Sequence, residues 1–153
     1  MKKYAVIVAG GSGMRMGTNM PKQFLPLRGQ PVLWYTLTAF LEAYSDLEII
    51  LVLPDTHVQT GKEILRSTQD PDRVWMAIGG PTRFHSVKNG LSHIHQHSIV
   101  FVHDGVRCLL TPDLVRRCYD MAMERGNAIP AVPAIDTIRI ENFNGNSQID
   151  RSR

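Results

Sequence analysis

The chain has 153 residues, a length typical of one domain, and 43% of them are hydrophobic, which is ordinary for a globular protein and too high for a disordered one. Its net charge is +3, and it has no dense Lys/Arg run interleaved with aromatic residues of the kind that marks a nucleic-acid interface. Its basic residues are separated, and separated cations that converge on one cleft suit a small polyanion. The two cysteines have neither zinc-site nor disulfide-framework spacing, and no stretch reaches the ~20 apolar residues that span a bilayer. We therefore expect a cytoplasmic protein with no nucleic-acid or membrane partner.

The first predicted strand, Tyr4–Ala9, runs directly into the glycine-rich segment 10–17, which contains Arg15. Ligands of an open α/β sheet bind beyond the carboxyl ends of its strands, and glycines there let backbone N–H groups approach a phosphate. Arg15 adds a permanent cation that can hold phosphate oxygens. The spacing fits neither a dinucleotide fingerprint, because the next helix is delayed to about Pro31, nor the nucleoside-triphosphatase loop, which needs Gly-Lys-Ser/Thr. Taken alone, the glycines also fit a purely structural turn.

A second loop, Met20–Leu27, carries a lysine between prolines. Pro21 and Pro26 stiffen it and exclude a regular helix, so the loop can hold Lys22 against the phosphates that Arg15 reaches. Without its neighbour, the same lysine could simply be exposed in a connection.

The rest of the chain alternates short apolar runs with amphipathic helical patterns, which predicts an α/β fold with a mostly parallel central sheet in three layers. Several runs are apolar without alternation, as expected for strands covered on both faces. The further predicted strands are Glu48–Leu53, Arg73–Ile78, Ile99–His103 and Ala128–Val132. Four helices are predicted. The first begins at Pro31 and buries Leu33, Leu37, Phe40, Leu41 and Tyr44, and the second covers about 55–67. The third has Phe84, Val87, Leu91 and Ile94 on one face, and the fourth runs from an N-cap at Thr111 to a stop at Gly126 and buries Leu114, Cys118, Met121 and Ala122.

After Pro133 the pattern changes, because Thr137–Glu141 and Ser147–Asp150 flank the hairpin signal Asn144-Gly145. We predict a nucleotide-binding α/β domain over residues 1–135 and a protruding β-arm over 136–153. An edge ribbon that stops there would have no helix to cover it, so we expect a truncated chain or a partner that completes it.

Two neighbouring motifs, Gly-Gly-Ser-Gly-Met-Arg-Met-Gly at 10–17 and Pro-Lys-Gln-Phe-Leu-Pro-Leu at 21–27, together resemble the signature of the methylerythritol-phosphate cytidylyltransferase family and its ribitol-phosphate relatives. Four later segments follow in the family's order: Gly79–Val87, His103–Arg107, Pro133–Ile138 and Asp150-Arg151. Gly105 and Cys108 depart from the family's usual Ala and Pro, which favours a more mobile loop after Arg107.

The resemblance implies a Rossmann-like, GT-A-like nucleotidyltransferase fold and attack of a sugar-alcohol phosphate on the α-phosphorus of CTP, with release of pyrophosphate. Because that nucleophile is already anionic, catalysis rests on positioning and on neutralising charge. The resemblance assigns this catalytic role to Arg15 and Lys22. It implies nucleotide contacts for Ala9, Gly10, Gly11, Ser12, Gly13, Gly80, Arg83, Ser86 and Asp104.

The acceptor phosphate, by the same resemblance, is contacted by Asp104, Arg107, Thr137 and Arg151, the last from the β-arm of a second subunit, which makes a homodimer the expected catalytic unit. Magnesium is expected mainly on the nucleotide phosphates, with Asp104 as the candidate protein ligand. The sequence leaves open whether the acceptor is methylerythritol phosphate or ribitol phosphate, and whether the chain only binds CTP without turnover.

Overall fold

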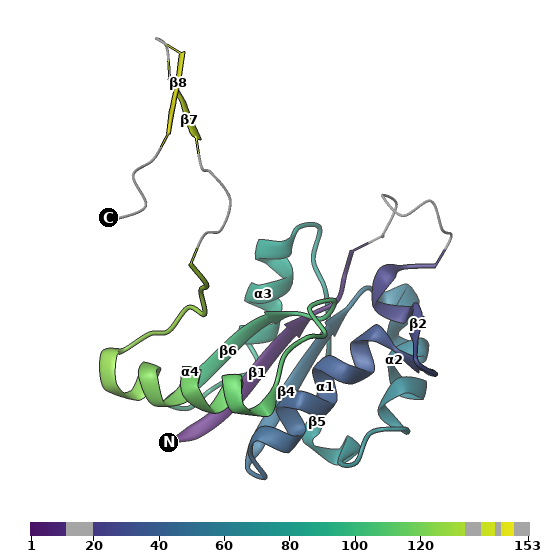
Figure 1. The fold of residues 1–153 in the computed structure, drawn as a ribbon. Coiled ribbons are helices and arrows are strands. Elements are labelled where there is room, and N and C mark those ends of the chain that lie inside the picture. Colours follow the sequence, from purple (N-terminus) through teal and green to yellow (C-terminus); the bar gives the residue numbers. More distant parts are fainter. Residues whose placement is uncertain (12–19, 134–138, 143–144, 149–153) are drawn as a thin grey trace.

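The computed structural model describes residues 1–11, 20–133, 139–142 and 145–148, and the structural statements below concern those residues. Its centre is a four-stranded parallel sheet in the order β5-β4-β1-β6 (Figure 1). The strands are β1 (Lys2–Val8), β4 (Leu47–Leu53), β5 (Val74–Ile78) and β6 (Ser98–Asp104). The predicted α/β class and four of the five predicted strands are therefore confirmed, with small shifts at the strand ends.

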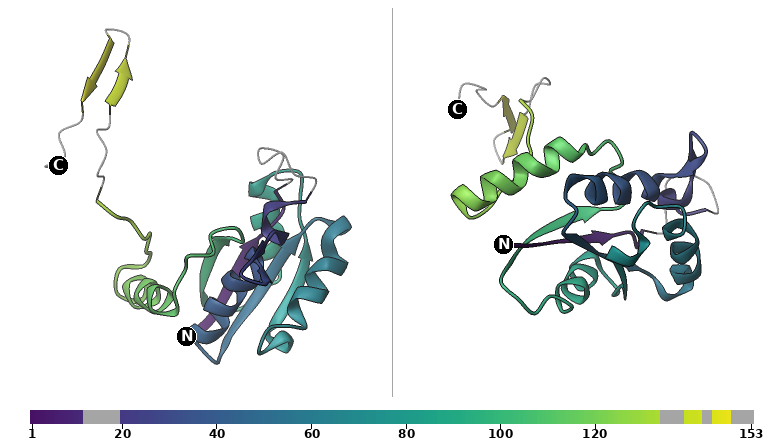
Figure 2. Two further views of the ribbon diagram at one scale, coloured as in Figure 1. Left: turned by 45° about the vertical axis from the view of Figure 1, so that its right-hand side comes forward. Right: turned by 90° about the horizontal axis from the view of Figure 1, so that it is seen from below.

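Helices cover both faces of this sheet (Figure 2). The larger core cluster joins one face of the sheet to α1, α2 and α4, and the smaller cluster lies on the other face, where α3 packs against β1, β4 and β5. The burial of strands on both faces explains why β1 and β4 read as continuous apolar runs. The helices are α1 (Val32–Ala43), α2 (Val58–Leu65), α3 (Arg83–Leu91) and α4 (Pro112–Arg125).

Short elements complete the described part of the chain. A β-hairpin pairs β7 with β8 in antiparallel register, so the predicted ribbon is present. Its second strand, however, begins at Gly145, which pairs with Asn142, and not at the predicted Ser147. None of the helices in the described residues is long and apolar enough to cross a membrane. The short elements are the 3₁₀ helices η2 (Lys22–Phe24), η3 (Asp55–His57) and η4 (Pro71–Arg73), the pair β2 (Pro26–Leu27) and β3 (Gln30–Pro31), and the hairpin strands β7 (Arg139–Asn142) and β8 (Gly145–Gln148).

The predicted strand Ala128–Val132 is wrong, because these residues have no regular structure and do not pair with the sheet. Ile129 and Val132 are 88% and 87% exposed. Pro130 lies inside the run and has no N–H to donate to a strand ladder. The chain leaves the end of α4 away from the sheet instead (Figure 1).

The cap predictions for α4 are confirmed, whereas its predicted buried face is partly wrong. The Thr111 side chain accepts a hydrogen bond from the Leu114 N–H, and Gly126 ends the helix with φ +84°. Met121, however, is 41% exposed, and Val115 is the buried residue of this helix. The predicted positions Leu114, Cys118 and Ala122 instead line an open groove of about 910 Å³ between α4 and β6. In the described part of the chain, no strand follows β6 in the sheet on this side.

The buried face of α3 also differs from the predicted apolar stripe. Phe84 is 70% exposed and Leu91 is 39% exposed, and the buried residues are Ser86 and Gly90. The helix lies so close to the sheet that a Cβ on Gly90 would come within 2.5 Å of Val6 Cγ1. Small residues therefore face the sheet here, whereas the predicted Val87 is half-buried and Ile94, just beyond the helix, packs against the smaller core cluster.

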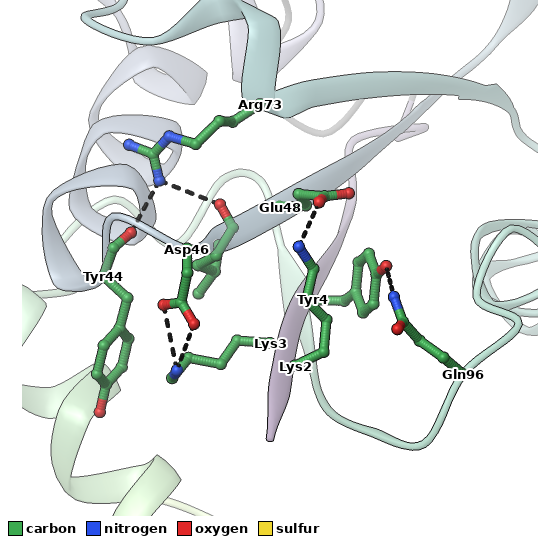
Figure 3. A network of polar contacts seen from close by, with 9 residues as sticks. Lys2, Lys3, Tyr4, Tyr44, Asp46, Glu48, Arg73 and Gln96 are labelled. Carbon is green, nitrogen blue, oxygen red and sulfur yellow. Dashed lines mark hydrogen bonds and ion pairs between the residues drawn. The ribbon is translucent and has the colours of Figure 1, made fainter.

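Polar contacts tie together the amino ends of the strands (Figure 3). Lys3 Nζ donates to Asp46 Oδ2 at 2.8 Å, and Lys2 pairs with Glu48 on β4. The Arg73 guanidinium donates to the backbone carbonyls of Tyr44 (2.8 Å) and Leu47 (3.1 Å), and to a third carbonyl on α1. These contacts fix one end of the sheet, and the opposite, carboxyl end remains open for a site.

Candidate functional site

A pocket of about 820 Å³ opens at the carboxyl ends of β1 and β6. Val8 and Asp104, the last residues of these strands, are direct partners in the parallel register, so the loops that follow them lie side by side. The segment after β5 contributes the third wall. The lining residues are Val8, Ala9, Gly10, Gly11, Lys22, Gln23, Gly80, Pro81, Thr82, Arg83, Ser86, Asp104, Val106 and Arg107.

The glycine-rich segment enters the pocket as a continuation of β1. Ala9 is buried, and its N–H still donates to Val52 O at 2.9 Å, whereas Gly10 and Gly11 are exposed. A Cβ on Gly11 would meet none of the described residues within 4 Å, and one on Gly10 would touch only Pro54 among them, at 4.0 Å. Packing therefore does not require these glycines, and their open backbone is free to approach a ligand.

The proline-flanked loop turns through the 3₁₀ helix η2, where the Phe24 N–H donates to Pro21 O at 2.9 Å. The Phe24 ring packs edge-on against His57 at 5.1 Å between ring centroids, which anchors the loop to η3. Lys22 lies beside this anchor, half-buried, lines the pocket, and forms no ion pair with any described residue. Its ammonium is thus available to an anion in the pocket.

Two arginines share one carboxylate on the opposite wall. Arg83 Nε donates to Asp104 Oδ1 and Arg107 Nε donates to Asp104 Oδ2, both at 2.9 Å. Partial burial acts to raise the pKa of the Asp104 carboxyl, but the hydrogen bonds and charges of the two arginines outweigh it and hold that pKa below its ordinary value. The arginine side chains remain 61% and 74% exposed, so a ligand can reach both.

The described lining residues carry an excess of positive charge. Three cations, Lys22, Arg83 and Arg107, face one carboxylate, Asp104, which leaves two positive charges unbalanced. An anionic ligand is therefore favoured over a neutral one.

The turn after β5 is built around Ser86. Its hydroxyl accepts from the Gly80 N–H at 3.1 Å and donates to Thr82 O at 3.1 Å, and the residue is 4% exposed. A Cβ on Gly80 would lie 2.4 Å from His85 Cβ, so the turn requires glycine there. Thr82 caps α3 with its side-chain oxygen. Ser86 thus shapes the wall from which Gly80 and Arg83 face the pocket.

The turn after β6, like the turn after β5, is fixed by hydrogen bonds to neighbouring segments. The Gly105 N–H donates to Val8 O at 2.9 Å, and the buried Thr36 hydroxyl on α1 donates to Gly105 O at 3.1 Å. A Cβ on Gly105 would lie 2.9 Å from that of Ala9, so glycine here serves close packing between the two loops.

Nine of the predicted site residues therefore line one pocket: Ala9, Gly10, Gly11, Lys22, Gly80, Arg83, Ser86, Asp104 and Arg107. Ser12, Gly13, Arg15, Thr137 and Arg151 lie outside the described residues. Gln23, Thr36 and Thr82 were not predicted. Threonine is a favoured N-cap residue, so Thr82 could have been found from the sequence, but nothing in the sequence marks Gln23 or Thr36, because their partners are backbone carbonyls of distant segments.

A protein-built metal site is not found in the described part of the chain, which contains no group of three or more His, Cys, Asp or Glu side chains that could hold an ion. Asp104 is the one carboxylate among the described lining residues, and both of its oxygens already accept from arginines. These residues fit a divalent cation only if most of its ligands come from elsewhere, such as the oxygens of a bound polyphosphate.

A parallel α/β sheet with an open glycine backbone and excess cations at its carboxyl edge defines a phosphate-binding domain of the nucleotide-binding class. The family model described as "IspD: 2-C-methyl-D-erythritol 4-phosphate cytidylyltransferase" matches residues 4–152, and the chain belongs to this family.

Curated relatives with that name agree with the assignment. The protein of Bacteroides thetaiotaomicron is 43% identical over 152 residues and that of Phocaeicola vulgatus is 40% identical, with 99% of this chain and 69% of each relative covered. The crystal structure of 4-diphosphocytidyl-2C-methyl-D-erythritol synthase from Anaerococcus prevotii matches with a TM-score of 0.81 at 28% identity, covering 99% of this chain and 64% of that one. The chain thus spans about two thirds of the length of these relatives, and the predicted family is confirmed.

Proposed function

We propose that this protein transfers CMP from CTP to 2-C-methyl-D-erythritol 4-phosphate and releases pyrophosphate. The observation that carries the proposal is the convergence of Lys22, Arg83 and Arg107 on one pocket beside the open backbone of Gly10 and Gly11. The names of the relatives support the choice of nucleotide and acceptor. The product would enter isoprenoid precursor synthesis by the methylerythritol phosphate route.

In the proposed reaction, a phosphate oxygen of the acceptor attacks the α-phosphorus of CTP. A new P–O bond forms as the bond between the α-phosphorus and the bridging oxygen breaks, and pyrophosphate leaves with that electron pair. The acceptor phosphate is already an anion, so the step needs no strong general base. The protein supplies position and positive charge, and an ammonium fixed in a partly water-excluded pocket needs little reorganisation as charge develops.

Each wall of the pocket has a separate proposed role. The backbone of Gly10 and Gly11 holds the triphosphate, and Lys22 stabilises the charge that develops at the α-phosphorus, together with Arg15. Gly80 and Arg83 face the cytidine.

Arg107 takes the acceptor phosphate. Asp104 accepts from both Arg83 and Arg107 and so orders the two side chains before ligands arrive, which lowers the ordering cost of binding. Thr137 and Arg151 stay predicted acceptor contacts.

Magnesium is proposed as the cofactor, held mainly by the nucleotide phosphates, with Asp104 as the carboxylate that the described lining residues offer, and it would neutralise phosphate charge. We further propose a homodimer formed through the β7–β8 hairpin, and a cytoplasmic location, which the two free cysteines suit.

The test is a pyrophosphate-release assay on the chain with CTP and magnesium, offering 2-C-methyl-D-erythritol 4-phosphate or ribitol 5-phosphate as acceptor. We expect release with the first acceptor and none above background with the second or without acceptor. Release with ribitol 5-phosphate alone would reassign the acceptor. Calorimetric binding of CTP without turnover on either acceptor would make the chain a nucleotide-binding module.

A further inference from the structure

Gln23 has a polar side chain buried between two loops of the pocket, the glycine segment after β1 and the loop that carries Lys22. It is 1% exposed, although it lines the pocket from behind. Its Nε2 donates to Ala9 O at 2.8 Å and to Gly11 O at 3.2 Å. One amide nitrogen therefore uses both of its hydrogens to grip the backbone on either side of Gly10.

The same residue is rigidly connected to Lys22. Both belong to η2, in which the Phe24 N–H donates to Pro21 O at 2.9 Å and the Leu25 N–H donates to Lys22 O at 3.2 Å. The Phe24 ring fixes this short helix on His57. The two side-chain hydrogen bonds of Gln23 therefore link the η2 backbone that carries Lys22 to the backbone on either side of Gly10.

An amide is the side chain that this position requires. Two carbonyl oxygens need two N–H donors, and a neutral donor adds no buried charge. A glutamate of the same size would direct carboxylate oxygens at the carbonyls, and a methionine of similar volume would leave both carbonyls without this partner. The need for an amide at position 23 therefore comes from the backbone carbonyls of Ala9 and Gly11 and not from packing in the hydrophobic core.

We propose that Gln23 is a positioning residue that sets the spacing between the Lys22 ammonium and the backbone of Gly10 and Gly11, and thereby controls recognition of the triphosphate. The inference rests on the proposed function for its ligand, CTP. Because Gln23 acts on the loops and not on the base, it affects phosphate-bearing ligands and leaves the nucleoside alone unaffected.

The test compares wild type with Gln23→Met, which keeps the volume and removes both donors. Calorimetry should show CTP affinity reduced about tenfold or more, with cytidine affinity unchanged. Amide hydrogen exchange of the ligand-free protein should show faster exchange at Phe24 and Leu25, while Ile50 in the sheet stays protected. Gln23→Asn keeps a donor amide one methylene shorter, and it should change both readouts in the same direction.

Thr68→Val is the matched control, since it removes a buried hydroxyl that donates to Leu65 O at 2.7 Å, and neither residue lines the pocket. It should lower thermal stability and leave CTP affinity unchanged, which separates positioning from general destabilisation.

The inference is overturned if Gln23→Met binds CTP within about twofold of wild type, or if CTP and cytidine weaken equally. If wild type binds no CTP, the proposed function fails by itself. The exchange rates at Phe24 and Leu25 then decide whether Gln23 fixes the two loops, and equal rates in wild type and Gln23→Met refute it.

Discussion

Replacing Lys22 with alanine should separate catalysis from stability. The lysine lines the anion pocket, is half-buried, and has no ion pair with a described residue, so its removal breaks no structural contact of that kind. We therefore expect the free energy of unfolding to stay within about 0.5 kcal/mol of wild type. One of the three cations among the described lining residues disappears, however, and with it the proposed donor to the charge that develops at the α-phosphorus.

The loss of one such donor lowers turnover by about 10²–10³-fold, which corresponds to roughly 2.7–4 kcal/mol of transition-state stabilisation. The assay is steady-state pyrophosphate release with CTP and 2-C-methyl-D-erythritol 4-phosphate, beside urea unfolding of the same preparations. Lys62→Ala is the matched control, because it removes the same charge from an exposed position on α2 outside the pocket.

Lys62→Ala should keep turnover near that of wild type. The reasoning is refuted if Lys22→Ala loses less than about threefold in turnover, or if both lysine variants lose activity equally, since a general charge effect would then suffice.

Acid should destabilise the fold in two steps that variants can separate. Burial holds the pKa of His103 below its ordinary value of about 6.5. Below that pH the unfolded chain binds a proton at this side chain more readily than the folded chain does, so the free energy of unfolding falls as the pH falls. His103→Phe should make the free energy of unfolding, measured in urea, depend less on pH between about pH 7 and pH 5, and an unchanged dependence would contradict this. The lowered pKa of Asp104 adds stability that is complete above about pH 4 and lost below it, so Asp104→Asn should flatten that later decline. Because the Asp104 charge acts to raise the pKa of His103, its removal should enlarge the first step rather than flatten it. Gly90→Ala should destabilise by up to about 2 kcal/mol, because overpacking against two stiff valines costs about 1–3 kcal/mol and the higher helix propensity of alanine returns about 1 kcal/mol. Gly61→Ala meets a leucine and a methionine at the same 2.5 Å, but these are flexible side-chain ends, so it should cost less in the same urea titration; the reverse order would contradict the packing argument.

Strands were predictable where burial on both faces leaves a continuous apolar run. β1 and β4 have such runs, and their parallel pairing follows from the helices between them. The same criterion wrongly predicted a strand at 128–132. These residues are as apolar as a strand, but Pro130 has no backbone N–H to donate to a neighbouring strand. Apolar content alone does not supply hydrogen-bond partners.

Helix faces were predictable only where large side chains fill the gap to the sheet. On α1, four of the five predicted residues are buried and the fifth, Tyr44, packs against the core from the C-cap. On α3 the helix lies too close for large residues, so Gly90 and Ser86 take the inner face and Phe84 is left outside. The distance between layers is a tertiary property that periodicity does not contain.

The loops that line the site were predictable from the sequence, because the carboxyl ends of parallel strands meet at one edge of a sheet. The residues that hold these loops in place were not predictable, since Gln23 and Thr36 donate to backbone carbonyls that come close to them only in the folded chain. The sequence thus indicates which side chains can meet an anion, and the structure adds what holds them.

The β1–β6 pairing links the core to the chemistry of the pocket. The register places Asp104 beside Val8, and one further hydrogen bond, from the Gly105 N–H to Val8 O, carries the ladder past the strand ends. Thr36 then ties Gly105 to α1, and the missing Cβ lets Ala9 approach. A register shift of one residue would move the carboxylate that holds Arg83 and Arg107 by about 3.3 Å, longer than either hydrogen bond it makes. The hydrophobic pattern that fixes this register therefore also fixes the spacing between the glycine backbone and the two arginines.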